Sequence, residues 1–266
     1  MTNLMWFRRD LRIDDNPALQ AAAESDFVGL MVLNPAQLEG AGEFPRERFL
    51  ASVRALDERL GGKLTLRVGD PLEVVPAVAA QIRAVKVFAA ADYTPFAIAR
   101  DQTVAAALGP DRLEFVGSAY AVAPGRVRKP DGDPYRVFTP FYKAWQAHGW
   151  RSPAGECDLS RLRKLESVEL PTATDLDFVG PVGEVAALAR WQSMRADWLA
   201  NYSHDRDRAD LDGTSWLSPA LRFGEIHPRT LLAELGNEPG QDRYRAELCW
   251  REFYADVLFH NPHTEH

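Results

Sequence analysis

One stretch of the sequence combines side chains that can carry charge, stack on a ring and donate hydrogen bonds. It reads Glu247-Leu-Cys-Trp-Arg-Glu-Phe-Tyr254. In a helix, residues three, four and seven positions apart share one face. That face would carry a carboxylate, an indole, a guanidinium and a phenol, from Glu247, Trp250, Arg251 and Tyr254. The mixture predicts a functional face; the alternative is a Glu247–Arg251 surface ion pair beside a half-buried Trp250.

A second stretch, Asp212-Gly-Thr-Ser-Trp-Leu-Ser-Pro-Ala-Leu-Arg-Phe-Gly224, places three hydroxyl groups before a predicted helix. The hydroxyls belong to Thr214, Ser215 and Ser218. The unpaired N–H groups and the dipole at the start of a helix both favour negative charge. The stretch therefore predicts an anion-binding site. The alternative is that Ser218 only caps a helix whose first residue is Pro219.

The elements that would position these residues begin with an α/β pattern. Five short apolar runs predict strands buried on both faces: Leu4–Phe7, Val28–Leu33, Leu64–Val68, Val85–Ala91 and Leu113–Val116. Helical patterns separate them at Pro17–Ala23, Pro45–Leu60, Leu72–Ile82 and Phe96–Leu108. This alternation predicts a doubly wound, Rossmann-like parallel sheet of five strands. No glycine loop follows Phe7, which argues against a conventional dinucleotide dehydrogenase.

After residue 120 the strand pattern is lost. Residues 121–181 are rich in Pro and Gly, and helical patterns follow at Val185–Ala200, Ile226–Leu235 and Arg243–Phe259. The sequence thus predicts an α/β domain at 1–122, a linker at 123–181 and the start of an all-helical domain at 182–266. Nine Lys or Arg against four Asp or Glu make residues 124–164 locally positive by five, with six aromatic residues between positions 135 and 150. This basic segment either lines a groove between the domains or packs it.

Composition excludes several other classes of protein. The 266 residues have ordinary globular proportions and a net charge of −7, and two cysteines cannot form a disulfide framework or a four-thiolate zinc site. The six histidines show no zinc-ligand motif, and no Gly-x-Ser-x-Gly sequence indicates a hydrolase. There is no signal-peptide core and no apolar run long enough to span a membrane, so we expect a cytoplasmic protein.

Taken in order, the motifs of this chain resemble those of the photolyase/cryptochrome family. Tyr202 with Arg206, Thr-Ser-Trp-Leu-Ser at 214–218 and Glu-x-x-Trp-Arg-Glu-Phe-Tyr at 247–254 are similar to its flavin-binding region. Trp-Phe-Arg-Arg-Asp-Leu-Arg at 6–12, Gly-Asp-Pro at 69–71, Arg100-Asp101 and the stretch 134–141 resemble its antenna domain. The branch that repairs cyclobutane pyrimidine dimers is the most similar.

The resemblance implies an FAD cofactor and a damaged-DNA substrate. In the family, photoexcited reduced FAD passes an electron to the dimer, the ring splits and the electron returns, while the protein positions the cofactor. Glu247 corresponds to the carboxylate that binds the base edges of the dimer, Trp250 to the ring on which the dimer stacks, and Arg206 to a DNA contact. Residues assigned in the same way to FAD are Tyr202, Thr214, Ser215, Ser218, Tyr244 and Arg251.

The same resemblance implies a second, antenna chromophore in the α/β domain. Phe96 and Ala97 occupy positions where folate-binding relatives carry a polar pair. Arg46 and Asp92 match positions used by deazaflavin-type relatives, so a deazaflavin is favoured over a folate.

Family members continue through further helices beyond the Glu-x-x-Trp-Arg motif, so we expect this chain to be a fragment or a truncated relative. Residues 201–266 carry seven Arg against twelve Asp or Glu, which does not make a DNA-binding surface alone. One alternative function is a cryptochrome-like blue-light photoreceptor without repair activity. Another is a nucleotide-binding α/β module that holds no flavin.

Overall fold

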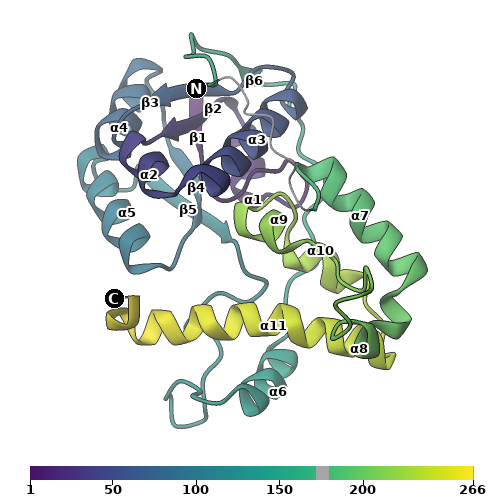
Figure 1. Ribbon diagram of the computed structural model, residues 1–266. Coiled ribbons are helices and arrows are strands. Elements are labelled where there is room, and N and C mark those ends of the chain that lie inside the picture. Colours follow the sequence, from purple (N-terminus) through teal and green to yellow (C-terminus); the bar gives the residue numbers. More distant parts are fainter. Residues whose placement is uncertain (172–179, 266) are drawn as a thin grey trace.

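The computed structural model describes residues 1–171 and 180–265 (Figure 1). Its N-terminal part is a parallel sheet of the strands β1 (Thr2–Phe7), β2 (Asp26–Leu33), β3 (Thr65–Val68), β4 (Val87–Ala91) and β5 (Leu113–Ser118). These strands run in the order β3-β2-β1-β4-β5. The predicted α/β fold with five parallel strands is confirmed. A two-residue strand, β6 (Leu162–Arg163), comes from the predicted linker and pairs with Phe27 and Val28 of β2.

Helices cover both faces of the sheet, as a doubly wound fold requires. They are α1 (Pro17–Ala23), α2 (Pro35–Gly40), α3 (Glu43–Arg59), α4 (Pro71–Gln81) and α5 (Pro95–Leu108). Buried residues of α1 and α3 pack on one face of the sheet, and those of α4 and α5 pack on the other. Asn16 caps α1, because its side chain accepts a hydrogen bond from the Leu19 N–H.

The second part of the chain is helical. Its helices are α6 (Phe138–His148), α7 (Glu184–Asp197), α8 (Tyr202–Asp205), α9 (Ser218–Phe223), α10 (Pro228–Ala233) and α11 (Pro239–His260), with 3-10 turns at Leu199–Asn201 and Pro262–Glu265. The sequence did not predict α6. Its Phe141 and Trp145 are buried in the core of the helical part, against α11. Figure 1 shows α6 lying alongside α11.

The predicted linker is divided between the two cores. Phe141 and Trp145 pack with the helical part, whereas Cys157 and Leu162 pack with the α/β part. Positions 172–179 of the predicted linker lie outside the described residues. The domain boundaries at 122 and 181 therefore stay predictions.

Buried polar contacts join the sheet to the helical part. Arg48 of α3 binds Glu225, which follows α9, at 2.6 Å. Asp15 binds Arg229 of α10, also at 2.6 Å. Gly224, with a φ of 71°, lies so close to the backbone of Arg9 that a Cβ atom would clash there. The glycine therefore lets the two parts meet backbone to backbone.

The start of α9 differs from its prediction. The helix begins at Ser218 itself, after Leu217, and no side chain caps it. Ser218 is thus the first helical residue and not the cap, so its hydroxyl is not used for capping. Helix α10 begins at Pro228, because the His227 side chain accepts a hydrogen bond from the Arg229 N–H and ends the preceding turn.

Candidate functional site

The structure brings two predicted site residues, Arg206 and Glu247, into direct contact. Arg206 ends helix α8 and its guanidinium donates a hydrogen bond to the Glu247 carboxylate of α11, 41 positions away. Arg243, one turn earlier on α11, lies 3.3 Å from the same carboxylate. The side chains of Arg206 and Glu247 are 23% and 29% exposed. A carboxylate between two guanidiniums therefore lies at the surface of α11.

Trp250 lies one turn further along α11 and is half-buried in a group of aromatic rings. Its ring is stacked on Phe138 of α6, with centroids 3.6 Å apart and planes 6° apart. Tyr254 stacks on it at 5.5 Å and is itself 64% exposed. A ring with an exposed aromatic neighbour can extend a stack to another planar group. In this structure, however, Phe138 already occupies a stacking position on Trp250.

Arg251 points away from Glu247, toward the α/β part. Its guanidinium donates to the carbonyl oxygens of Ala119 (2.8 Å) and Leu221 (3.2 Å), and it lies over the Tyr120 ring at 4.8 Å. Burial lowers the Arg251 pKa, while the nearby Tyr120 and Glu252 raise it. The alternative of a Glu247–Arg251 surface pair is therefore wrong, because Arg251 joins α11 to the end of β5 and to α9.

Tyr244 contacts both Tyr202 and, in the hydroxyl-rich stretch, Ser215. The rings of Tyr202 and Tyr244 meet edge to face at 5.1 Å, and Tyr244 stacks on Trp191 of α7 at 5.3 Å. Burial raises the Tyr244 pKa, and a hydrogen bond with Ser215 opposes that rise. Tyr244 thus supports Ser215, and Tyr202 packs against Tyr244.

Arg190 holds the hydroxyl-rich stretch through its backbone carbonyl groups, and two side-chain hydroxyls of the stretch make no hydrogen bond within the described residues. Arg190 of α7 donates to the carbonyl oxygens of Thr214 (2.9 Å) and Ser215 (3.2 Å) and pairs with Asp212 at 2.8 Å. The Ser215 hydroxyl accepts from the Leu217 N–H. Among the residues that the structure describes, the hydroxyls of Thr214 and Ser218 have no hydrogen-bond partner.

These free hydroxyls provide a test of whether the chain fits FAD. Thr214 is half-buried and Ser218 is exposed at the first turn of α9. Hydroxyl donors beside the start of a helix suit a phosphate group. The residues present therefore fit the phosphate end of a dinucleotide, although Arg251 does not face it.

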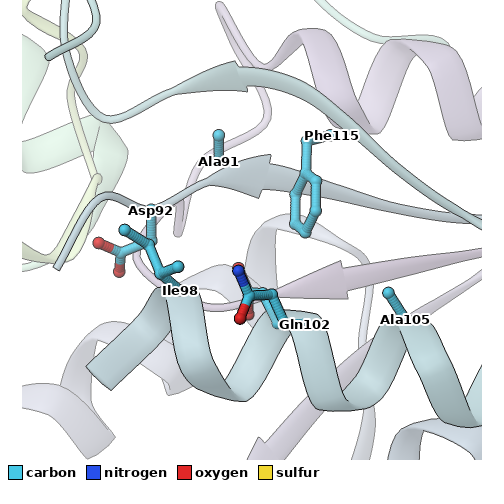
Figure 2. Close-up of a pocket in the computed structure, with 7 residues that line it drawn as sticks. Ala91, Asp92, Ile98, Gln102, Ala105 and Phe115 are labelled. Atoms are coloured by element: carbon cyan, nitrogen blue, oxygen red, sulfur yellow. The ribbon is translucent and has the colours of Figure 1, made fainter. Parts of the chain in front are cut away.

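The two predicted antenna residues are not brought to one place. Asp92 follows β4 and lines a cavity of about 220 Å³ at the carboxyl ends of β1 and β2, together with Phe96 and Arg100. Arg46 does not line this cavity, and its guanidinium binds the neighbouring Glu47 at 3.1 Å. Asp92 also borders a smaller, mostly apolar cavity between α5 and the β4–β5 edge, which Ile98, Gln102 and Phe115 line (Figure 2).

Sequence reasoning missed the roles of Phe138, Arg190 and Arg243. The four-residue spacing of Arg243 and Glu247 is a local signal that could have predicted their pair. No local signal predicts that Phe138 covers Trp250 or that Arg190 holds Thr214, because those contacts join different helices.

The described residues form neither a metal site nor a membrane span. Across residues 1–171 and 180–265, no group of three or more potential ligands is arranged to hold a metal ion. Within the same ranges, no helix is both long and apolar enough to cross a membrane.

Comparison with known proteins agrees with this architecture. Residues 3–158 match the model of the DNA photolyase family. This chain belongs to that family. It is 36% identical to a deoxyribodipyrimidine photo-lyase of Thermus thermophilus over 97% of the chain and 61% of that protein. It is 33% identical to one from Synechococcus sp. PCC 6301 over 97% of the chain and 60% of the relative. This photolyase-family chain thus spans about 60% of the length of these two relatives.

A shorter relative and a solved structure are also similar to this family member. An uncharacterized 31.6 kDa protein of Synechococcus sp. PCC 6716 is 34% identical over 94% of this chain and 98% of its own length. A crystal structure of a class III photolyase from Agrobacterium tumefaciens superimposes with a TM-score of 0.84 at 28% identity. The match covers 98% of this chain and 60% of the Agrobacterium chain. A Synechocystis cryptochrome shares the fold, with a TM-score of 0.82 at 24% identity.

Proposed function

We propose that this chain carries the antenna and lesion-binding parts of a deoxyribodipyrimidine photo-lyase that splits cyclobutane pyrimidine dimers in DNA. The observation that carries the proposal is the cluster on α11. There, Arg206 and Glu247 meet at the surface, one turn from Trp250 and its exposed neighbour Tyr254. A guanidinium for a phosphate, a carboxylate for base edges and a ring for stacking are the groups needed to hold a flipped-out pyrimidine dimer.

We propose that each of these side chains gives up its present partner in the protein when it binds the lesion. Arg206 would turn from Glu247 to a DNA phosphate, because a partly exposed ion pair is held weakly. The freed Glu247 carboxylate would then accept hydrogen bonds from the base edges. Trp250 would stack on the dimer with the face of its ring that Phe138 does not cover, or with the covered face once Phe138 moves aside.

The cofactor is proposed to be FAD, bound first by its phosphates. Thr214 and Ser218 would donate their free hydroxyls, and Ser215, Tyr202 and Tyr244 would fix that wall of the site. Arg251 would act by fixing α11 against Ala119 and Leu221. When bound and reduced, FAD would supply the light-driven electron that splits the dimer.

A second chromophore is proposed in the cavity lined by Asp92. Phe96 and Ala97 add only apolar groups to its wall, which favours a deazaflavin over a folate. Partners and location are proposed accordingly: damaged DNA as substrate and the cytoplasm as compartment.

The experiment uses the purified chain mixed with FAD under reducing conditions and an oligonucleotide containing one thymine dimer. Flavin content is read by absorbance, and dimer splitting per absorbed photon is measured under blue light. We expect Glu247→Gln to lower the splitting yield about tenfold, the loss expected for a hydrogen bond to a charged group, with flavin content unchanged. Glu238→Gln, at an exposed carboxylate before the same helix, is the matched control. Equal losses of flavin and repair in Glu247→Gln would contradict its proposed role.

The cofactor site has a separate test. Replacing Thr214, Ser215 and Ser218 together by Ala should leave the chain without flavin. A triple variant that keeps its flavin absorbance would contradict the phosphate site.

A cryptochrome-like photoreceptor remains the second candidate, on one observation. Both proposed lesion contacts are engaged within the protein, Glu247 by two arginines and Trp250 by Phe138. A sensor could keep these contacts throughout its cycle. A flavin-containing chain with no dimer splitting under blue light would favour this function over repair.

A further inference from the structure

A cavity of about 550 Å³ lies beside the end of β5, away from the proposed FAD and antenna sites. Its walls come from the strand ends, the segment after β5, the turn after α6, and α10. The residues that bear on its chemistry are Tyr93, Tyr120, Arg126, Trp150, Arg151 and Arg229. No residue of α5, α8, α9 or α11 lines it, and it shares no lining residue with the larger cavity of Asp92. It adjoins the smaller cavity of Figure 2 at Ala91 and Phe115. Its volume is in the range typical of small-molecule sites.

The charged side chains that line this cavity are basic. Three arginines and His148 line it, and no carboxylate of residues 1–171 or 180–265 does. Arg229 is already engaged, since it binds Asp15 at 2.6 Å. Within the described ranges, the guanidiniums of Arg126 and Arg151 make no hydrogen bond or ion pair. Two unpaired guanidiniums in a concave site attract anions, and their planar fork suits phosphate oxygens.

No carboxylate in the described part of the chain forms an ion pair with either of these two arginines. Asp92 and Glu252 lie near enough to Tyr120 to affect its phenol, but neither lines the cavity. Glu252 is buried and accepts from the N–H groups of Ala121 and Val122 and from Trp145. Its carboxyl oxygens therefore hold the segment that forms one wall.

The remaining walls present aromatic rings. Tyr93 and Tyr120 meet edge to face at 6.3 Å, and Trp150 packs on the buried Trp145 at 4.4 Å. None of the hydroxyls of Tyr93 and Tyr120 or the indole N–H of Trp150 has a hydrogen-bond partner among the residues described. Rings with free polar edges can hold a planar heterocycle by contact and by hydrogen bonds.

We propose that this cavity binds a phosphorylated aromatic ligand of the nucleoside diphosphate class. Arg126 and Arg151 would hold the phosphates, and Tyr93, Tyr120 and Trp150 would surround the base. The site gives the basic segment at 124–164 a divided role. Arg126 and Arg151 serve the cavity, while Arg161 and Arg163 bind the Glu24 carbonyl oxygen and the Asp26 carboxylate at the start of β2.

The test is a calorimetric titration of the purified full chain with ADP, adenosine and inorganic pyrophosphate as probes. We expect ADP to bind more tightly than either fragment, because only ADP reaches both halves of the site. Arg126→Gln combined with Arg151→Gln should weaken ADP about 100-fold, as expected for two charge-assisted hydrogen bonds. Arg136→Gln with Lys143→Gln removes the same charge from exposed positions of the basic segment that do not line the cavity, and should leave ADP affinity unchanged.

Two further variants separate this site from the proposed FAD site. Thr214→Ala with Ser218→Ala should leave ADP binding intact while reducing flavin binding. Trp150→Phe should weaken ADP and adenosine together but leave pyrophosphate unchanged. Loss of ADP binding in the Thr214/Ser218 variant would assign ADP to the FAD site and overturn the proposal. The proposal would also be overturned if the Arg126/Arg151 variant and the Arg136/Lys143 control bound ADP equally well, or if the wild-type chain did not bind ADP.

Discussion

Two groups of arginine–carboxylate pairs in this protein have the same chemistry and very different surroundings. Where the sheet meets the helical part, the Arg48–Glu225 and Arg229–Asp15 side chains are each less than one-tenth exposed. On α11, the side chains of Arg206 and Glu247 are about a quarter exposed. The buried carboxylates are fully used: Glu225 accepts from both terminal nitrogens of Arg48 and from the Gly183 N–H.

The difference shows which pairs hold the fold and which can take part in binding. Charges removed from water are costly to leave unpaired, so the buried pairs cannot exchange partners without loss of the fold. A partly exposed pair is screened by solvent and contributes little, so its members can turn to a ligand. The family's DNA contacts are therefore proposed on α11 and not at the boundary between the two parts.

The largest expected effect comes from breaking a buried pair. Glu225→Ala should lower the free energy of unfolding by about 3–5 kcal/mol, because Arg48 stays buried without its partner. Urea unfolding followed by circular dichroism measures the loss. Arg48→Met combined with Glu225→Leu should recover most of it, since no buried charge is left unpaired. A loss near zero in Glu225→Ala would contradict the structural role of the pair.

A smaller loss is expected on the α11 surface where Phe138 covers Trp250. Phe138→Ala should cost about 2 kcal/mol, because it removes a half-buried ring and its stacking contact. The same urea titration measures it, and the tryptophan emission should shift to longer wavelength as Trp250 meets water. Val137→Ala, at the neighbouring exposed position, is the control. Unchanged emission would show that Phe138 does not cover Trp250 in solution.

A pH-dependent effect is expected at the boundary between the parts, from His227. Burial, with the nearby Arg12 and Arg229, holds the His227 pKa well below its usual value of 6.5. Its Nε2 lies 2.9 Å from the Ser118 carbonyl, and its Nδ1 accepts from the Arg229 N–H, which suits the neutral ring. Asp15 lies 3.4 Å from Nδ1, but Arg229 already pairs with that carboxylate.

The sign of this effect follows from which state binds the proton. Below about pH 6.5 the unfolded chain protonates His227 and the folded chain does not, so stability falls as the pH falls, by at most about 1.4 kcal/mol per pH unit. His227→Gln should flatten this slope in urea unfolding measured between about pH 5 and pH 8. His204→Gln, at an exposed histidine, should follow the wild type. Parallel curves for His227→Gln and the wild type would contradict the buried neutral ring.

The smallest effect is expected from the exposed pair. Glu247→Ala should change the free energy of unfolding by less than about 1 kcal/mol, in contrast to Glu225→Ala. A double-mutant cycle with Arg206→Gln measures their coupling, which should shrink in about 1 M salt because the pair is screened. A coupling that is large and insensitive to salt would place Glu247 with the structural carboxylates.

Short-range patterns explain why much of the fold could be predicted. A buried parallel strand needs a continuous apolar run, and an N-cap needs Asn16 next to Pro17, so both signals lie within a few residues. The α6 helix lacked such a signal. Its aromatic residues between prolines suggested an irregular linker, and it is stabilised by burial of Phe141 and Trp145 against α11. Packing energy from distant residues formed this helix where local propensity was weak.

The sequence by itself determined the family, the parallel sheet and the two stretches of chemically active side chains, because each depends on spacings within one element or one motif. Only the tertiary structure decided which of those side chains meet. One turn of α11 directs Glu247 to Arg206, Trp250 to Phe138 and Arg251 to Ala119, three partners from separate segments of the chain. Helical spacing fixes the direction of a side chain, but its partner depends on which helix packs against that face.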